Sequence, residues 1–271
     1  MFFSEYLYRR GLALLAACVF SAAGAAPAPV PVRHEEGLLH GFLVLRTLQG
    51  ETLAHGDLLQ NVHGDRVTSR LTLHFKDGSI HDETAVFSQR GSFRLLSDHL
   101  VQRGPAFERA VEMTVDGEAG QVTVRYSDDG KDKTTKERLA LPPDLCNGMI
   151  FTLLKNIRPG APETKVSFLA PTPQPRMVRL SIRPQGEEPF DIAGVPSKAM
   201  RYDVKVELGG LSGALASLLG KEPPDTQVWI LEGEAPVFVK SEGALAPGGP
   251  VWRIEAVSPS WPRAAGPQEK K

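Results

Sequence analysis

Histidine is the residue type whose distribution first indicates chemistry in this chain. All seven histidines lie between residues 34 and 99 of the 271. Imidazole nitrogens on neighbouring strands can chelate a divalent metal, and a two-residue turn at Asp77-Gly78 would bring His74 opposite His81. Strand alternation, however, puts His74 on a polar face beside Thr72. We therefore interpret both histidines as solvated surface residues, and His74 and His81 are only weak metal candidates.

Adjacent carboxylates offer no general acid and base pair. Glu35-Glu36, Asp128-Asp129 and Glu187-Glu188 lie beside predicted turns or proline, where charge is ordinarily solvated. The sequence also lacks a nucleophile elbow, a phosphate-binding loop, paired histidines at metalloprotease spacing and a paired CxxC. We predict no catalytic residue, no metal, no cofactor and no enzymatic activity.

The first 25 residues have the composition of an export signal. Arg9-Arg10 precedes an apolar run at 11–20, and small residues follow at 21–25. This run is far shorter than the ~20 residues of a membrane-spanning helix. We predict a signal peptide over residues 1–25 and export to the periplasm.

A second interpretation of the same segment is lipidation. Leu15 to Cys18 matches the bacterial lipobox, and lipidation of Cys18 would anchor the protein peripherally to the outer membrane. The apolar Val19-Phe20 after the cysteine favours soluble export, and the arginine pair fits the twin-arginine motif poorly. If Cys18 is removed, Cys146 has no disulfide partner within the chain, and we interpret it as a buried small apolar residue.

Composition excludes one class of partner. A formal net charge of −1, with 41% apolar and 23% charged residues, is ordinary for a globular protein. No basic run is interleaved with aromatic residues, so we do not expect nucleic acid as a partner.

Strands are the elements that must position any site. Apolar and polar residues alternate at 66–75 and again at 200–208. Three runs rich in Val, Ile, Phe and Trp within 225–259 predict an antiparallel meander. The polar run at 132–139 is typical of an exposed edge strand.

Two segments have helical patterns. An apolar stripe predicts a helix over residues 144–157, with Asp144 as its cap. A Gly- and Leu-rich segment predicts a short second helix over 211–219 that caps the sheet or covers a concave apolar surface. We predict a mostly all-β fold, a strongly twisted antiparallel sheet or open barrel, as a single domain over residues 38–258. A Pro-rich tether at 26–37 precedes the domain, and a disordered tail at 259–271 follows it.

The closing meander carries a family resemblance. Val228-Trp229-Ile230, a glycine turn and then Ala-Pro-Val-Phe-Val-Lys at 235–240 resemble the uncharacterised bacterial envelope proteins grouped as domain of unknown function 3108. More distantly, the chain is similar to periplasmic lipoprotein carriers of the Lol type. That resemblance implies a half-barrel with acyl chains on its concave face.

These inferences lead to an expected function. We expect a non-enzymatic envelope protein that binds an apolar or lipidic ligand, either a lipid or a lipidated protein, on the concave face of its sheet. The candidate lining residues are Trp229, Phe238, Trp252, Leu211, Leu215 and Leu218. The alternative is a lipid-anchored scaffold or assembly factor that acts through its surface, which lipidation of Cys18 would favour.

Overall fold

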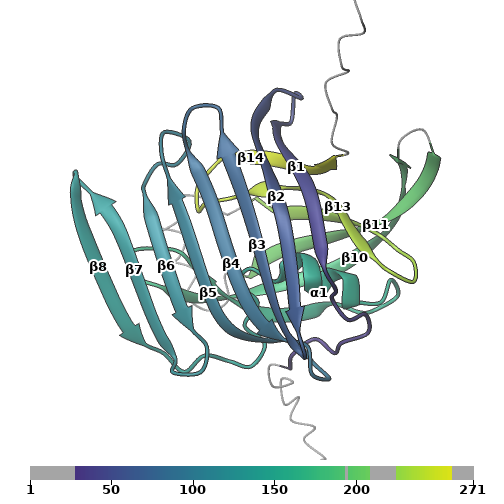
Figure 1. The fold of residues 1–271 in the computed structure, drawn as a ribbon, viewed down its shortest axis with the longest axis horizontal. Coiled ribbons are helices and arrows are strands. Elements are labelled where there is room, and N and C mark those ends of the chain that lie inside the picture. Colours follow the sequence, from purple (N-terminus) through teal and green to yellow (C-terminus); the bar gives the residue numbers. More distant parts are fainter. Residues whose placement is uncertain (1–27, 193–194, 208–223, 258–271) are drawn as a thin grey trace, which may run out of the picture.

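The computed structural model describes residues 28–192, 195–207 and 224–257 (Figure 1). This part of the chain forms one antiparallel sheet of 14 strands and one short helix. The elements are β1 Leu39–Thr47, β2 Thr52–His63, β3 Arg66–Phe75, β4 Ile80–Ser88, β5 Arg94–Arg103, β6 Val111–Asp116, β7 Gln121–Asp128, β8 Lys131–Arg138, α1 Ile150–Asn156, β9 Thr164–Ala170, β10 Arg176–Ile192, β11 Val195–Glu207, β12 Thr226–Leu231, β13 Val237–Ala244 and β14 Val251–Val257. The predicted signal peptide, second helix and C-terminal tail lie outside the described residues.

Two meanders make up the sheet. Strands β1 to β8 pair in sequence order, strands β9 to β14 do the same, and β14 then pairs with β1, with Ile254 opposite Leu45. β8 and β9 remain at the two ends of the strand order, so the sheet does not close into a barrel. The predicted fold class, a mostly all-β antiparallel sheet or open barrel with one packed helix, is confirmed.

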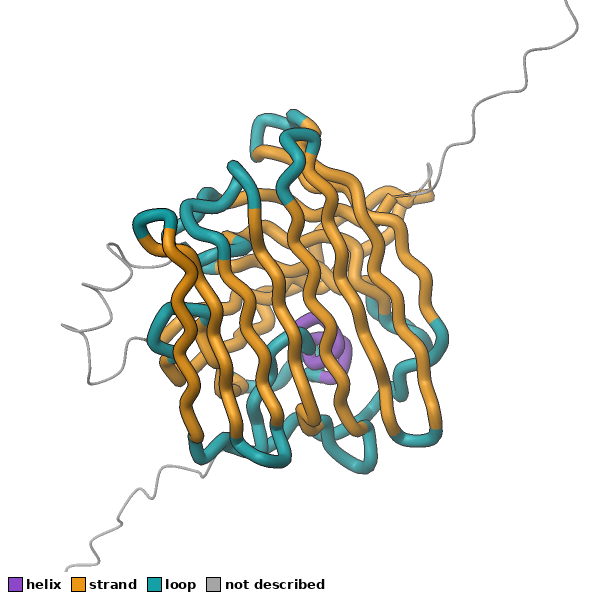
Figure 2. Tube along the Cα trace, turned by 60° about the vertical axis from the view of Figure 1, so that its left-hand side comes forward, coloured by secondary structure: helices purple, strands orange, loops and turns teal. Residues whose placement is uncertain are grey.

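The sheet curves back over itself around the helix. Figure 1 shows β1 to β8 as a front layer, with β10 to β14 crossing behind it and α1 between them. Figure 2, turned by 60°, shows α1 within the same curve. The concave side therefore holds the core, including the fully buried Leu45, Phe87, Leu154 and Tyr202.

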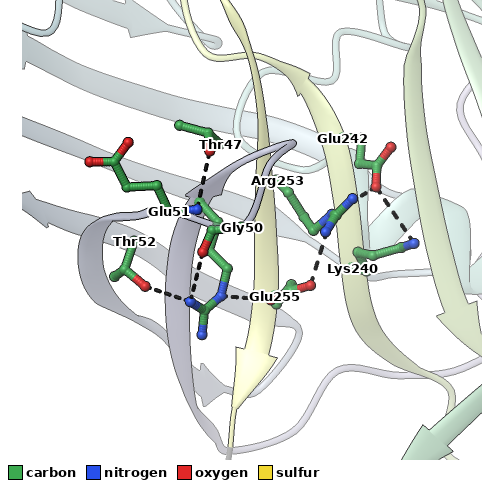
Figure 3. Close-up of polar contacts among 9 residues, drawn as sticks. Thr47, Gly50, Glu51, Thr52, Lys240, Glu242, Arg253 and Glu255 are labelled. Atoms are coloured by element: carbon green, nitrogen blue, oxygen red, sulfur yellow. Dashed lines mark hydrogen bonds and ion pairs between the residues drawn. The ribbon is translucent and has the colours of Figure 1, made fainter.

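Charged pairs line the outer face where the two meanders meet (Figure 3). The Arg46 guanidinium lies 3.1 Å from Glu255, and Arg253 lies 2.8 Å from Glu242, which is also 3.6 Å from the Lys240 ammonium. Exposed pairs of this kind contribute about 0–1 kcal/mol each. Backbone pairing and the apolar inner face must therefore supply most of the stability of the β1–β14 junction.

The helix is shorter than the predicted 144–157 because Gly148 interrupts the pattern with a φ of +65°. Asp144 is not its cap. The Asp144 carboxylate instead accepts hydrogen bonds from Ser167 at 2.9 Å and Arg179 at 3.0 Å. The helical spacing of apolar residues extends into the segment before Gly148, but the backbone of that segment bonds to β9 instead. The helix therefore begins later than its sequence pattern predicts.

The turn between β3 and β4 has three residues, and the predicted two-residue turn was wrong. Phe75 accepts a hydrogen bond from the Gly78 N–H at 3.1 Å, and the Phe75 N–H donates to Ser79 at 3.0 Å. His74 consequently pairs with Ile80, and Leu73 pairs with His81. This shift by one residue puts His81 on the inner face, because side chains alternate across a strand.

Packing begins before the predicted domain start at residue 38. Within the expected tether, Val30 is buried and Pro31 forms an isolated bridge with Ser92. The segment also contacts the C-terminal end of α1, where the Asn156 side chain accepts from the backbone N–H groups of Arg33 and His34 at 2.7 and 2.8 Å. Proline prevents a continuous ladder here, but not isolated backbone bonds on either side.

The two edges of the sheet are protected differently. β8 is polar and mostly exposed, as predicted. Beside β9, the Asn147 side chain bonds both the N–H and the carbonyl of Leu169 at 2.9 Å, and Leu145 forms a parallel bridge with Ser167. The segment before α1 thus satisfies part of an edge that would otherwise present unpaired backbone groups.

Candidate functional site

A pocket of about 350 Å³ lies on the concave side of the sheet. Both meanders and α1 contribute to its wall, which is mainly apolar. Its larger apolar residues are Leu39, Leu43, Leu58, Leu71 and Leu100 from the first meander, Ile150 and Phe151 from α1, and Phe168, Val178, Leu180, Val204, Val206, Phe238, Trp252 and Ile254 from the second. Small-molecule sites commonly have volumes of about 300–1,000 Å³ and similar linings.

Polar side chains interrupt this wall on β4 and β5. His81, Glu83 and Ala85 share the inner face of β4, and they lie opposite Gln102, Leu100 and Asp98 of β5. Glu83 and Asp98 are therefore diagonal neighbours on one face, a relation that separates Cα atoms by about 7–8 Å. His81 and Glu83 line the pocket, whereas Asp98 is fully buried behind it.

His81 is a neutral donor at this position. The Gln102 amide nitrogen donates to the Leu245 carbonyl at 2.6 Å and contacts His81 Nδ1 at 3.0 Å. Since a carbonyl only accepts, that atom of Gln102 is the NH2 group, and Nδ1 accepts from it. The ring proton then resides on Nε2, which has no hydrogen-bond partner among the residues that the structure describes. Burial lowers the pKa of His81 to about 4, so the ring is uncharged at neutral pH.

The two carboxyl groups resist ionisation. Burial raises the pKa of Glu83 to about 7, although the Gly148 backbone N–H donates to it and lowers the pKa in part. Burial and then the charge of Glu83 raise the pKa of Asp98 well above its ordinary value. Both oxygens of Asp98 are buried without a hydrogen-bond partner in the described part of the chain. Such groups are disfavoured as anions and can act as neutral donors or as proton acceptors near neutral pH.

Gly148 fits this arrangement closely. A Cβ atom at this position would lie 2.6 Å from the Ala85 Cβ and 3.0 Å from Asp98 Oδ1. Its positive φ and this close approach both favour glycine. Glycine at position 148 therefore allows the segment before α1 to pack directly against Glu83 and Asp98.

A buried ion pair fixes α1 beside the pocket. The Lys155 ammonium lies 2.6 Å from Glu36, and their side chains are only 10% and 6% exposed. Gln89 holds Glu36 through two further bonds with its backbone, at 2.7 and 3.3 Å. The N-terminal segment is thus part of the structure that positions the helix.

The predicted lining residues are divided by the structure. Phe238 and Trp252 line the pocket, and Phe238 stacks on Phe151 with ring centroids 4.0 Å apart. Trp229 does not line it. It belongs to a separate cluster with Ala199 and Val239, where its ring lies 3.7 Å from the Lys240 ammonium. Leu211, Leu215, Leu218 and Cys18 lie outside the described residues.

The predicted pair of His74 and His81 does not form. His74 is exposed on the outer face, while His81 is 3% exposed on the inner one, so the expectation of a solvated His81 was wrong. The described ranges contain no group of three or more His, Cys, Asp or Glu residues suited to a metal ion. Across the same ranges, no helix has the length and apolar character needed to cross a bilayer.

Sequence reasoning missed Glu83, Asp98 and Gln102. A signal for the first was present, because His81 and Glu83 occupy the same alternation phase as Ala85 and Phe87, which marks an inward face. The proximity of Asp98 depends on the β4–β5 register, which shifts at a bulge beside Phe87. No short sequence pattern indicates how β4 and β5 pair.

Comparison with known proteins adds little to the geometry. No family model and no curated protein matches the sequence. One similar solved structure is a β-barrel-like protein of domain of unknown function 1849 from Brucella abortus, with 11% identity and a TM-score of 0.44, over 82% of this chain and 98% of that one. At this level the likeness says nothing about ligand or activity. The resemblance to domain of unknown function 3108 stays a prediction.

Proposed function

We propose that this protein is an exported, non-enzymatic protein of the cell envelope that binds an apolar or lipidic ligand on the concave face of its sheet. The observation that supports the proposal is the pocket of about 350 Å³ between the two meanders and α1. Folded proteins rarely leave a large apolar surface accessible without a function. A mainly apolar pocket of this size is therefore a candidate site for an apolar ligand.

A small residue helps to keep the space open. Gly41 lines the pocket from β1, and a Cβ atom there would meet only Leu58, at 3.9 Å. Glycine within a strand weakens the strand, and it often marks the close approach of a ligand or another backbone. A larger side chain at position 41 would enter the pocket without a backbone clash.

The export and the lipidic class of ligand rest on sequence alone. The N-terminal segment supports export, with Cys18 as the alternative site of lipid anchoring. The resemblance of the meander to envelope proteins and Lol-type carriers supports a lipid or a lipidated protein as the ligand.

The binding test uses N-phenyl-1-naphthylamine, a neutral probe whose fluorescence rises in apolar surroundings. We expect saturable binding by the mature protein and displacement by dodecanol. Gly41→Phe should fill the pocket and weaken probe binding by tenfold or more. Gly37→Phe is the matched control, because Gly37 is exposed, has no neighbour within 4 Å of an added Cβ and does not line the pocket. Equal binding by both variants would refute the pocket as the site.

Glu83 favours a second candidate function, general acid or base catalysis on an apolar substrate. A carboxyl group with a pKa of about 7 inside an apolar pocket has the protonation behaviour that such catalysis needs. The test is hydrolysis of p-nitrophenyl octanoate by the wild type and by Glu83→Gln. Turnover that is lost in this variant would support an enzyme, whereas equal background rates would count against it.

A further inference from the structure

Polar residues on the inner faces of β2, β4 and β5 interrupt the apolar wall, and we call this group the acidic pole and define it as Gln60, His81, Glu83 and Asp98. Gln60 lies on β2 and lines the pocket, with an exposed fraction of 3%. Its amide nitrogen donates to the Thr152 hydroxyl at 3.4 Å, while its Oε1 is buried and has no partner within the described ranges. Unsatisfied buried polar atoms are rare in folded proteins and call for a specific explanation. Gln60 Oε1 and His81 Nε2 are therefore signs of a missing partner that are independent of the carboxyl groups.

Positive charge is lacking at the acidic pole. The titratable groups near Glu83 are His81 on the same face of β4, Asp98 on β5 and Cys146 before α1, and Lys155 of α1 lines the same pocket. His81 is neutral, and the buried Cys146 thiol has a strongly raised pKa, so neither contributes charge. Only Lys155 among these groups is a cation.

Lys155 is already neutralised. Its ammonium is held 2.6 Å from Glu36, and the nearby Asp144 is held 3.0 Å from Arg179. Within the described residues, Glu83 thus faces acidic, neutral or already paired groups. A carboxylate buried without a counter-ion is costly, and a bound cation would remove that cost.

Acceptors also dominate the hydrogen-bonding capacity of the pole. Glu83 lines the pocket with a carboxyl group, and Gln60 Oε1 and both Asp98 oxygens are buried acceptors without a partner among the described residues, whereas His81 supplies a single N–H. An ammonium group carries three N–H donors and one positive charge. The apolar remainder of the wall matches a hydrocarbon body.

We propose that the acidic pole binds the positively charged amine of an apolar ligand, with the Glu83 carboxylate as its counter-ion and Gln60 Oε1 as a further acceptor. This inference rests on the proposed function, because it assigns the head group of a ligand whose body occupies the same pocket. Binding couples to protonation: the amine requires ionised Glu83, so its affinity rises with pH until Glu83 is fully ionised. Hydrogen bonds to charged groups are strong enough to give tenfold or greater discrimination.

The experiment compares dodecylamine, dodecanol and dodecanoic acid as competitors of N-phenyl-1-naphthylamine, below their micellar concentrations, at pH 5.5 and pH 8. Dodecylamine stays cationic at both values, because alkylamines have pKa values near that of lysine, ~10.4. At pH 8 we expect the amine to bind about tenfold or more tightly than the alcohol. That preference should shrink severalfold at pH 5.5.

Glu83→Gln should abolish the preference of the pocket for dodecylamine over dodecanol. Asp82→Asn is the matched control, since Asp82 lies on the same strand but pairs with Arg70 on the outer face, and this variant should keep the preference. The pH comparison in the wild type tests the idea even if Glu83→Gln folds poorly. Equal binding of the three competitors, or preference for the acid or alcohol, would overturn the inference and leave the pocket standing. Binding of none of them would refute the proposed function itself.

Discussion

Replacement of Glu83 by glutamine should change the pH dependence of stability. In the folded chain the pKa of Glu83 is raised from 4.5 to about 7, chiefly by burial. A raised carboxyl pKa means that the folded state binds more protons than the unfolded state between these values. The stabilisation that comes from protonated Glu83 is therefore fully present below pH 4.5 and is lost as pH rises through about 7.

Each pKa unit corresponds to about 1.36 kcal/mol, so ionisation of Glu83 lowers the free energy of unfolding by about 3 kcal/mol between pH 4 and pH 8. Glutamine has the same shape and can still accept from Gly148, but it has no proton to lose. We therefore compare the free energy of unfolding of Glu83→Gln with that of the wild type at each pH. The variant's value minus the wild type's value should be about 3 kcal/mol larger at pH 8 than at pH 4.

Urea denaturation at several pH values measures this difference, because the midpoint and slope give the free energy of unfolding. Asp82→Asn serves as the control. Its hydrogen bond with Arg70 holds the pKa of Asp82 below 3.8, so Asp82 is ionised through most of this range and its variant should differ from the wild type by a nearly constant amount between pH 4 and pH 8. A stability difference for Glu83→Gln that stays constant within about 0.5 kcal/mol across this range would refute the burial of this carboxyl group.

Three further predictions concern the surroundings of the pocket. Burial lowers the pKa of His81 from 6.5 to about 4, so in the same denaturation series the stability of the wild type relative to His81→Gln should fall by about 3 kcal/mol as pH falls through that window. Lys155→Met leaves Glu36 buried without its partner and should cost about 3–5 kcal/mol, much of which Glu36→Gln should restore in the double variant. Gly148→Ala places a methyl group against Ala85 at positive φ and should destabilise by about 1–3 kcal/mol, with an unchanged thermal midpoint as the contradicting result.

Local patterns predicted much of the fold. Strand alternation at 66–75 put Leu73 and Phe75 on the inner face of β3, and both are buried. Polarity predicted that β8 would be an edge. These features depend on the two-residue period of side chains along a strand and on contact with water. A few consecutive residues are enough to indicate both.

The wrong predictions concern features that depend on contacts between residues distant in the sequence. Asp77-Gly78 is compatible with both a two- and a three-residue turn, and the choice of the longer one reversed the predicted position of His81. Gly148 ended the helical pattern because the chain packs against Asp98 there. Glu83 and Asp98 meet only through the register of two strands, so no local motif announced the acidic pole.

Native mass spectrometry of the protein purified gently from the cell envelope tests the central claim most directly. The account predicts an additional mass matching an apolar molecule on the wild type, and its loss from Gly41→Phe, whose new side chain would occupy the pocket. The retained molecule should carry an amine if the acidic pole acts as proposed. A wild type that carries no added mass under conditions that preserve lipid complexes would contradict the account.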